Sequence, residues 1–260
     1  MIEDLARLAD LGRDGLAGGF VVFLRVGAAM AVLPAFGEQS VPRRVRLGLA
    51  LAFTLIVAPA VLPVLPDTGT DPAALVRLYG AEVAVGLVLG LGLRLFVLAL
   101  QTAGAMAAQA TSLSQIFGGS AGVDPQPAIA HLLTIAGLAL AVLADLHIRV
   151  AEALVASYEG FPPGVFPHPG LIASWGTFRV AEAFATGFTL AAPFVVASLV
   201  YNVALGVINR AMPQLMVAFV GAPALTFGGL ALMFLALPAL LQVWLGALNL
   251  YLGDPFGAGP

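Results

Sequence analysis

Residues 81–100 read AEVAVGLVLGLGLRLFVLAL, an apolar run that contains only two charges, Glu82 and Arg94. A helix of about 20 apolar residues spans the hydrocarbon core of a bilayer. A charged side chain at the centre of such a helix costs about 2.5–3.5 kcal/mol on insertion scales, so both charges are expected to face protein or water. The stretch predicts a membrane helix that packs against other helices.

The composition of the whole chain agrees with this interpretation. Of the 260 residues, 60% are hydrophobic and 10% are charged, and the mean hydropathy is +1.01. A soluble domain carries about 25% charged residues. If this chain folded in water, it would expose large apolar patches. We therefore predict an all-α, polytopic integral membrane protein. Cysteine is absent, which excludes disulfides, and no basic patch indicates nucleic-acid binding.

Further apolar runs of helical length cover residues 16–36, 47–66, 75 to beyond 94, 127–146, 177–208 and 214–252. We expect a short amphipathic lead-in helix before them, without a cleaved signal peptide, because the first residues are acidic. The Gly- and Pro-rich stretches at 118–127 and 157–176 are typical of loops. The run 214–252 is too long for one span, and Pro238 in its middle predicts a hairpin or a sharp kink.

We expect one helical membrane domain over residues 1–260. Its residues 1–175 hold the N-terminal helices, and 176–252 hold a long helix and a hairpin. The segment 109–127 reads QATSLSQIFGGSAGVDPQP and follows a helical face of small and polar residues. It is either an ordinary exterior loop or a movable plug over a pore. The candidate plug residues are Gln109, Ser112, Ser114, Phe117, Gly118, Gly119, Gly122, Asp124 and Pro125.

Buried charges need partners. Glu82 and Arg94 are 12 residues apart, about 18 Å along a helix, and cannot pair with each other. Together with Arg25 in the first run, they are expected in inter-helix ion pairs or snorkelling towards the membrane surface, or else on a proton or ion path. Gly86 and Gly90, four residues apart, predict a groove in which another helix, here expected from a partner subunit, packs closely.

Asp145, His147 and Arg149 could suggest a metal or catalytic site. Asp145 and Arg149 are neighbours on one helix face, which favours a helix-end ion pair. His131 lies 16 residues before His147, about 24 Å along a helix, so we expect no metal site. No GxSxG or GxxxxGK[ST] motif occurs, so we expect no enzyme, no nucleotide and no cofactor.

Residues 209–223 read NRAMPQLMVAFVGAP. Arg210 suits the C-terminal end of a helix, where the dipole favours a cation, and Pro213 suits the first turn of the next helix. Gly221 and Pro223 are then expected to bend or thin that helix so that a neighbouring subunit packs against it. The alternative is an ordinary helix–turn–helix in a monomeric membrane protein.

Three blocks in order resemble the FliR/SctT family of type III export gate subunits: FLRVGAAMAVLPAFGEQSVPRRVRLGLALAFTLIVAP (23–59), GAEVAVGLVLGLGLRLFVLALQTAGAMAAQ (80–109) and the 209–223 stretch, which fits R-x-x-P-Q-L-N-V-F-x-x-G-x-P. Met216 and Ala218 depart from the family's Asn and Phe. Residues 144–164 look more like the flagellar branch. The family-motif residues are Pro34, Pro42, Arg43, Arg46, Arg210, Pro213, Gln214, Gly221 and Pro223.

The resemblance implies a FliP-like part joined to a FliQ-like C-terminal helical hairpin. It implies a structural subunit of the flagellar export gate in the bacterial inner membrane, within the flagellar basal body. FliP and FliQ would form with it a channel for unfolded flagellar proteins, FlhB and FlhA would be further partners, and lipid would surround part of it. Arg25, Glu82 and Arg94 would hold subunits together, and 109–127 would plug the lumen. An injectisome subunit of SctT type and an ion-coupled small-solute transporter remain alternatives.

Overall fold

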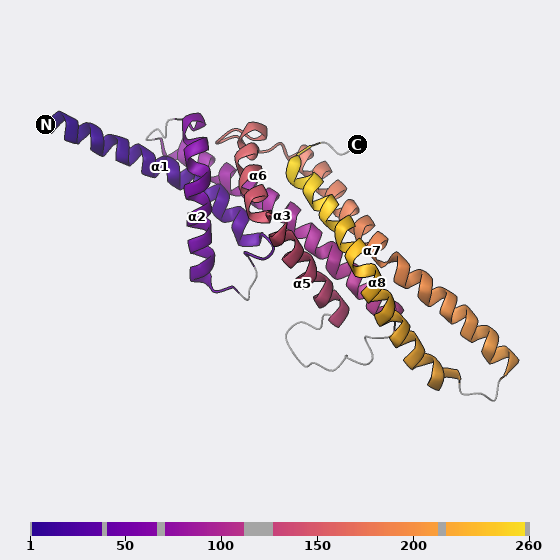
Figure 1. The fold of residues 1–260 in the computed structure, drawn as a ribbon. Helices are drawn as coiled ribbons and strands as arrows, with labels where there is room; N and C mark the ends of the chain where they lie inside the picture. The colour runs from indigo at the N-terminus through magenta and orange to yellow at the C-terminus, as the bar shows by residue number, and fades with distance from the viewer. Residues whose placement is uncertain (1, 38–40, 67–70, 112–126, 213–216, 258–260) are drawn as a thin grey trace. The chain divides into compact units, whose positions relative to one another are not determined.

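The computed structural model describes residues 2–37, 41–66, 71–111, 127–212 and 217–257, and all the regular structure in these ranges is helical (Figure 1). Five of the helices in these ranges are long and apolar enough to cross a membrane, or six if the bent pair α5 (Ala128–Leu143) and α6 (Leu146–Gly160) is one span. The prediction of an all-α polytopic membrane fold is confirmed. The helices are α1 (Ile2–Val32), α2 (Arg43–Val61), a short 3-10 helix η1 (Leu62–Val64), α3 (Pro72–Ala110), α5 (Ala128–Leu143), α6 (Leu146–Gly160), α7 (Pro169–Ala211) and α8 (Val217–Gly253).

The chain divides into two compact units. The first unit consists of Met1–Arg94, Asp145–Arg179 and Asn249–Pro260, and the second of Leu95–Ala144 and Val180–Leu248. Helices α3, α7 and α8 each contribute residues to both units. The single-domain assignment from sequence therefore stays a prediction.

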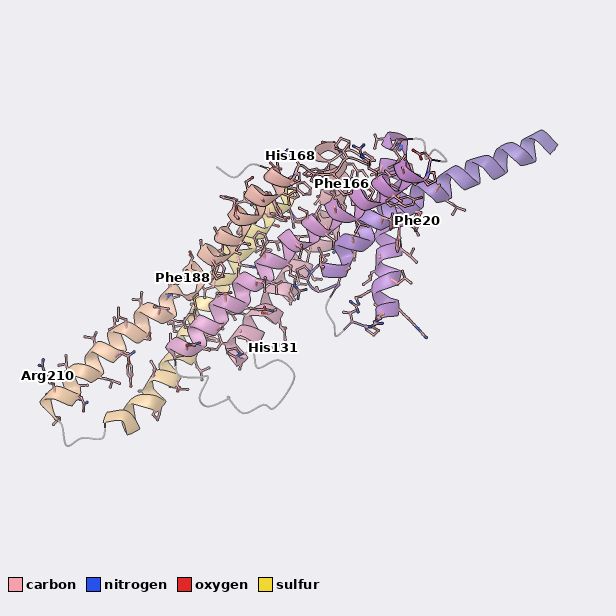
Figure 2. The ribbon with its side chains drawn as sticks, turned by 180° about the vertical axis from the view of Figure 1, so that it is seen from behind. Phe20, His131, Phe166, His168, Phe188 and Arg210 are labelled. Carbon is pink, nitrogen blue, oxygen red and sulfur yellow. The ribbon has the colours of Figure 1, made fainter. Side chains whose placement is uncertain are left out.

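In the first unit, α1 packs against α2, and α2 packs against α6. Aromatic side chains anchor α3 beside them: Phe20 of α1 makes a T-shaped contact with Tyr79, at 5.5 Å between ring centroids, and the Phe166 ring lies against Gly80 (Figure 2). After α1, the chain turns back towards α2 at Gly37. A Cβ on Gly37 would lie 2.7–2.8 Å from three backbone carbonyls, so this turn requires glycine.

In the second unit, small residues allow close packing between α3 and α5. A Cβ on Gly104 would lie 2.2 Å from Ala130 Cα, so the two backbones are in near contact. The Trp244 indole Nε1–H of α8 donates to the Phe96 carbonyl oxygen at 2.9 Å, and the Trp244 side chain is buried. This hydrogen bond satisfies the indole in an otherwise apolar environment.

The sequence predicts a hairpin or a sharp kink at Pro238. The hairpin is wrong, because α8 runs unbroken from Val217 to Gly253 through Pro223 and Pro238. Proline is tolerated in membrane helices where neighbouring groups satisfy the freed backbone. The C-terminal hairpin is formed instead by α7 and α8. Within the second unit, the Tyr201 hydroxyl of α7 donates a hydrogen bond to the Gly221 carbonyl oxygen of α8.

Two further boundaries differ from expectation. The helix predicted over 127–146 ends at Leu143, and a second helix, α6, begins at Leu146 after a bend of 74°. Asp145 takes a left-handed conformation, with φ of 61°, at this bend. The loop predicted over 157–176 is shorter, because α7 already begins at Pro169. In the first turn of α7, the Gly170 N–H donates to His168 Nδ1 at 3.2 Å.

Candidate functional site

A buried ion pair joins α1 to α3 in the first unit. Arg25 Nε donates to Glu82 Oε2 at 2.8 Å, and Arg25 Nη2 donates to Glu82 Oε1 at 3.0 Å. Both residues are 0% exposed. The geometry is bidentate, the strongest form of an arginine–carboxylate contact. The inter-helix ion pair expected for buried charges is therefore present, and it lies within one chain.

Residues at the end of α6 and in the loop before α7 complete this site. The guanidinium Nη1 donates to the Ser157 hydroxyl at 3.0 Å, and Nη2 also donates to the Phe161 carbonyl oxygen at 2.9 Å. The guanidinium carbon lies 3.6 Å from the centre of the Tyr158 ring. The Gly164 N–H donates to the Glu82 carboxylate at 3.4 Å. The pair thus fastens α1, α3 and α6 at one point.

This arrangement suits a structural function. Moving two charges out of water costs several kcal/mol per ion, which is offset only where the geometry is good and the remaining donors and acceptors are satisfied. Here the guanidinium has three different acceptors and stacks on Tyr158, and the carboxylate has a second donor. The same contacts leave Arg25 and Glu82 engaged with each other, so their predicted contribution to subunit contacts stays a prediction.

Gly86 and Gly90 bring α3 close to α1 directly beside this ion pair. A Cβ on Gly86 would lie 2.2 Å from the Arg25 carbonyl oxygen, and a Cβ on Gly90 would lie 2.6 Å from the Ala29 carbonyl oxygen. The predicted groove for a closely packed helix is present. The helix in it is α1 of the same chain, so this groove is not open to a partner subunit.

The other predicted charges lie apart from this site. Arg94 is exposed on α3, and within the described residues its guanidinium has no carboxylate partner. The predicted Asp145–Arg149 ion pair is wrong: both side chains are exposed, and only the backbones interact, through Arg149 N–H to the Asp145 carbonyl oxygen at 3.2 Å. Asp145 precedes α6 in a left-handed conformation, so its side chain does not occupy an i,i+4 position on a continuous helix.

Most of the predicted plug lies outside the described residues. Gln109 is exposed in the last turn of α3, whereas Ser112, Ser114, Phe117, Gly118, Gly119, Gly122, Asp124 and Pro125 fall in 112–126. Among the residues that the structure describes, no group of three or more His, Asp or Glu side chains could hold a metal ion.

The family-motif residues fall at helix ends and turns. Arg210 lies in the last turn of α7 (Figure 2). Gly221 is buried against α7, since a Cβ there would lie 2.7 Å from the Tyr201 hydroxyl. The close contact predicted at Gly221 is thus an intrachain one. Pro34 is buried just after α1, Pro42 precedes α2, Arg43 and Arg46 lie in the first turn of α2, Pro223 is exposed in α8, and Pro213 and Gln214 are outside the described residues.

Sequence reasoning missed the partners that complete the ion pair. Ser157, Tyr158, Phe161 and Gly164 belong to a stretch that its Gly and Pro content assigned to a loop. Two signals were available: a Ser and a Tyr adjoin an apolar helix, and Gly164 is a candidate for positive φ, which it adopts at 74°. The carbonyl of Phe161 has no signature in the sequence.

The fold and this site define a polytopic helical membrane protein whose helices are fastened by a buried ion pair and by close glycine contacts. The sequence matches the family "Bacterial export proteins, family 1" over residues 16–250, and the chain belongs to this family. It is 38% identical to "Flagellar biosynthetic protein FliR" of Caulobacter vibrioides over 228 residues, which is 86% of this chain and 90% of the relative. It is 32% identical to the protein of that name from Pectobacterium carotovorum and 30% identical to that from Escherichia coli, each over 84% of both chains.

Proposed function

We propose that this chain is a non-enzymatic structural subunit of the flagellar type III protein export gate. The observation that carries the proposal is the 38% identity to a flagellar FliR protein over most of both chains. FliP and FliQ are its partners in a channel for unfolded flagellar proteins, FlhB and FlhA are further partners, and the bacterial inner membrane at the flagellar basal body is its location. The flagellar names of the relatives favour this function over an injectisome gate or a small-solute transporter.

The surface of the described helices supports a protein that works inside an assembly. Only 11% of the apolar window in α7 is buried within the chain, against 56% in α3. Large apolar side chains project from α7, among them Phe188, at 61% exposed (Figure 2), and Leu199, at 62%. Such a surface exceeds what a single chain in water could leave uncovered and is available to lipid and to partner subunits.

The test of this function is copurification from the native membrane. A tagged full-length chain is extracted in mild detergent, and the intact complex is weighed by mass spectrometry. We expect a hetero-oligomer that contains FliP and FliQ, and loss of flagellar filaments when the gene is removed. A solitary chain that transports a small solute in liposomes would contradict the proposal and favour the transporter alternative.

We also propose that 109–127 closes the gate at rest. Deletion of residues 110–122 is expected to leave the assembled complex intact and to raise the ion permeability of the membrane, because the lumen then lacks its seal. The measurement is potassium or proton leak in cells that carry the deletion, with the copurified complex as a check on assembly. An unchanged permeability together with normal export of flagellar proteins would exclude a plug in this segment.

A further inference from the structure

A cavity of about 540 Å³ lies between α1, α2 and α3 in the first unit, apart from the buried ion pair. Its size is within the range of pockets that hold small organic ligands, about 300–1,000 Å³. Its walls are mainly apolar and include Phe23, Leu24, Met30, Leu47 and Val83. Two cations, Arg43 and Arg46, complete the lining.

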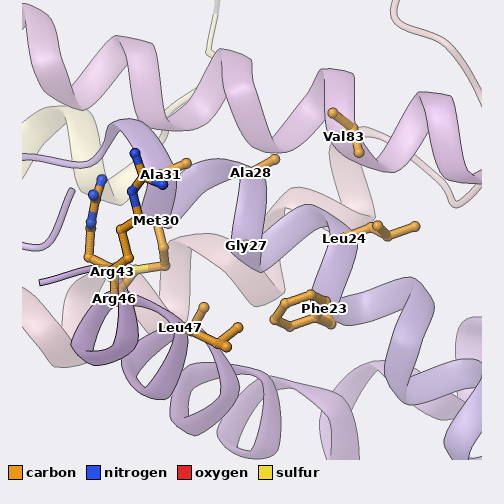
Figure 3. A pocket seen from close by; sticks show the side chains of 11 residues that line it. Phe23, Leu24, Gly27, Ala28, Met30, Ala31, Arg43, Arg46, Leu47 and Val83 are labelled. Carbon is orange, nitrogen blue, oxygen red and sulfur yellow. The ribbon is translucent and has the colours of Figure 1, made fainter.

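The two cations lie at one end of this cavity, and the opposite end is apolar (Figure 3). Figure 3 shows Arg43 and Arg46 beside Met30, whereas Phe23 and Leu24 lie at the other end. The pocket is therefore amphipathic along its length. A ligand that fits it has an anionic group at one end and an apolar body at the other.

The cationic end has unused capacity to bind an anion. Arg46 Nε is buried and has no hydrogen-bond partner, and Arg46 Nη1 makes only a long contact, 3.5 Å, to the Gly37 carbonyl oxygen. Within the described residues, no carboxylate pairs with Arg43 or Arg46. These residues open α2, which has no side-chain cap and no acidic residue in its first turn. The positive end of the helix dipole adds to their charge.

The position along the membrane helices fits a lipid headgroup. The apolar window of α2 begins at Arg43, and that of α1 ends at Val32, next to Met30. The cationic end thus lies at the ends of two candidate spans, where lipid headgroups meet a spanning helix, and Phe23 and Leu24 lie within the α1 window. Basic pockets between membrane helices commonly bind anionic lipid headgroups.

We propose that the α1–α2 cavity is a binding site for one anionic phospholipid, with the phosphate held by Arg43 and Arg46 and part of an acyl chain against Phe23, Leu24 and Val83. The lipid fills the gap between α1 and α2 beside the last turn of α1. This goes beyond general solvation by the bilayer, because it assigns one lipid class to one site.

The test is native mass spectrometry of the full-length chain in mixed micelles with equal amounts of phosphatidylglycerol and phosphatidylcholine. We expect one phosphatidylglycerol to remain bound in preference to phosphatidylcholine. Exchange of both cations, as R43Q/R46Q, lowers its affinity about 25-fold, at about fivefold for each cation near a headgroup. Arg44→Gln is the matched control, because Arg44 is an exposed neighbour on the same turn that does not line the cavity.

A second variant separates the site from a general loss of folding. Gly27 lines the cavity, and the three atoms nearest to a Cβ there belong to the Phe23 ring, at ordinary contact distances of 3.7–3.9 Å. Gly27→Leu therefore adds side-chain volume inside the cavity and keeps both cations, and we expect it to displace the lipid. R43K/R46K keeps the charge and should retain most of the binding.

Four outcomes would overturn the proposal. The first is equal retention of both lipids by the wild-type chain. The second is unchanged phosphatidylglycerol binding in R43Q/R46Q or in Gly27→Leu. The third is displacement of the lipid by glycerol 3-phosphate alone at similar concentration, which would show an anion site without a chain-binding cavity. The fourth is a partner polypeptide that occupies the cavity in the native complex, with no lipid bound.

Discussion

Glu82→Ala lowers the free energy of unfolding of the full-length chain by about 3–5 kcal/mol, because it leaves the Arg25 guanidinium buried without its carboxylate. Ser157 and the Phe161 carbonyl keep two of the guanidinium's hydrogen bonds, at 3.0 and 2.9 Å, but neither supplies a negative charge. The measurement is denaturant unfolding of the purified chain in detergent micelles, followed by the fluorescence of its two Trp residues.

A second substitution distinguishes a broken ion pair from a simple loss of side-chain volume. Replacing both charges by apolar residues of similar size, as R25M/E82L, removes the uncompensated charge and should recover much of the lost stability. Arg94→Ala is the matched control, because Arg94 is charged, lies on the same helix and is exposed. Its effect should stay within about 0.5 kcal/mol. A double variant less stable than Glu82→Ala alone would show that the pair itself contributes net stability.

The sequence predicts that buried charges need partners, and it does not predict which charges pair. Arg25 and Arg94 both lie in apolar runs and are equivalent by local pattern. The structure buries Arg25 completely against Glu82 and leaves Arg94 exposed. This difference is set by which helix faces meet, a long-range property that composition and periodicity within one run do not contain.

The positions of helix breaks are also not predicted by the local sequence. Pro238 is a strong local breaker, yet α8 passes through it. The chain instead bends by 74° between α5 and α6, where the sequence LADLH contains neither Gly nor Pro. Asp tolerates the left-handed conformation better than most residues, so Asp145 permits this bend, although an Asp alone does not predict one. Tertiary packing decides which of the permitted breaks is used.

The glycine pattern was the most informative local signal. The spacing of Gly86 and Gly90 predicts a close helix approach, and the structure shows it. The approaching helix was expected to belong to a partner subunit, and it is α1 of the same chain. Gly92 and Gly104, which no motif singled out, make equally close contacts, with Tyr251 and Ala130 respectively. A chain with 30 glycines offers too many candidates for spacing alone to rank.

Gly86→Ala destabilises the chain by about 1–3 kcal/mol, although alanine is the better helix former. Its Cβ would lie 2.2 Å from the Arg25 carbonyl oxygen and 3.0 Å from Ala28 Cβ, so α1 and α3 must move apart. The matched control is Gly48→Ala in α2, where nothing lies within 4 Å of the new Cβ. That variant should gain about 0.5–1 kcal/mol from helix propensity. The same unfolding experiment measures both, and we expect opposite signs.

The Cβ added in Gly86→Ala would clash with the backbone of Arg25, whose side chain forms the ion pair with Glu82. The destabilisation by Gly86→Ala and the loss of the ion pair are therefore coupled. Displacing that backbone moves the guanidinium away from Glu82, and part of the destabilisation by Gly86→Ala is therefore loss of the ion pair. In a double-mutant cycle, Gly86→Ala combined with Glu82→Ala should lose less stability than the sum of the two single losses, by at least about 0.5 kcal/mol. Strict additivity would mean that α1 shifts without disturbing the guanidinium, and the two contacts would then be independent fastenings of α1 to α3.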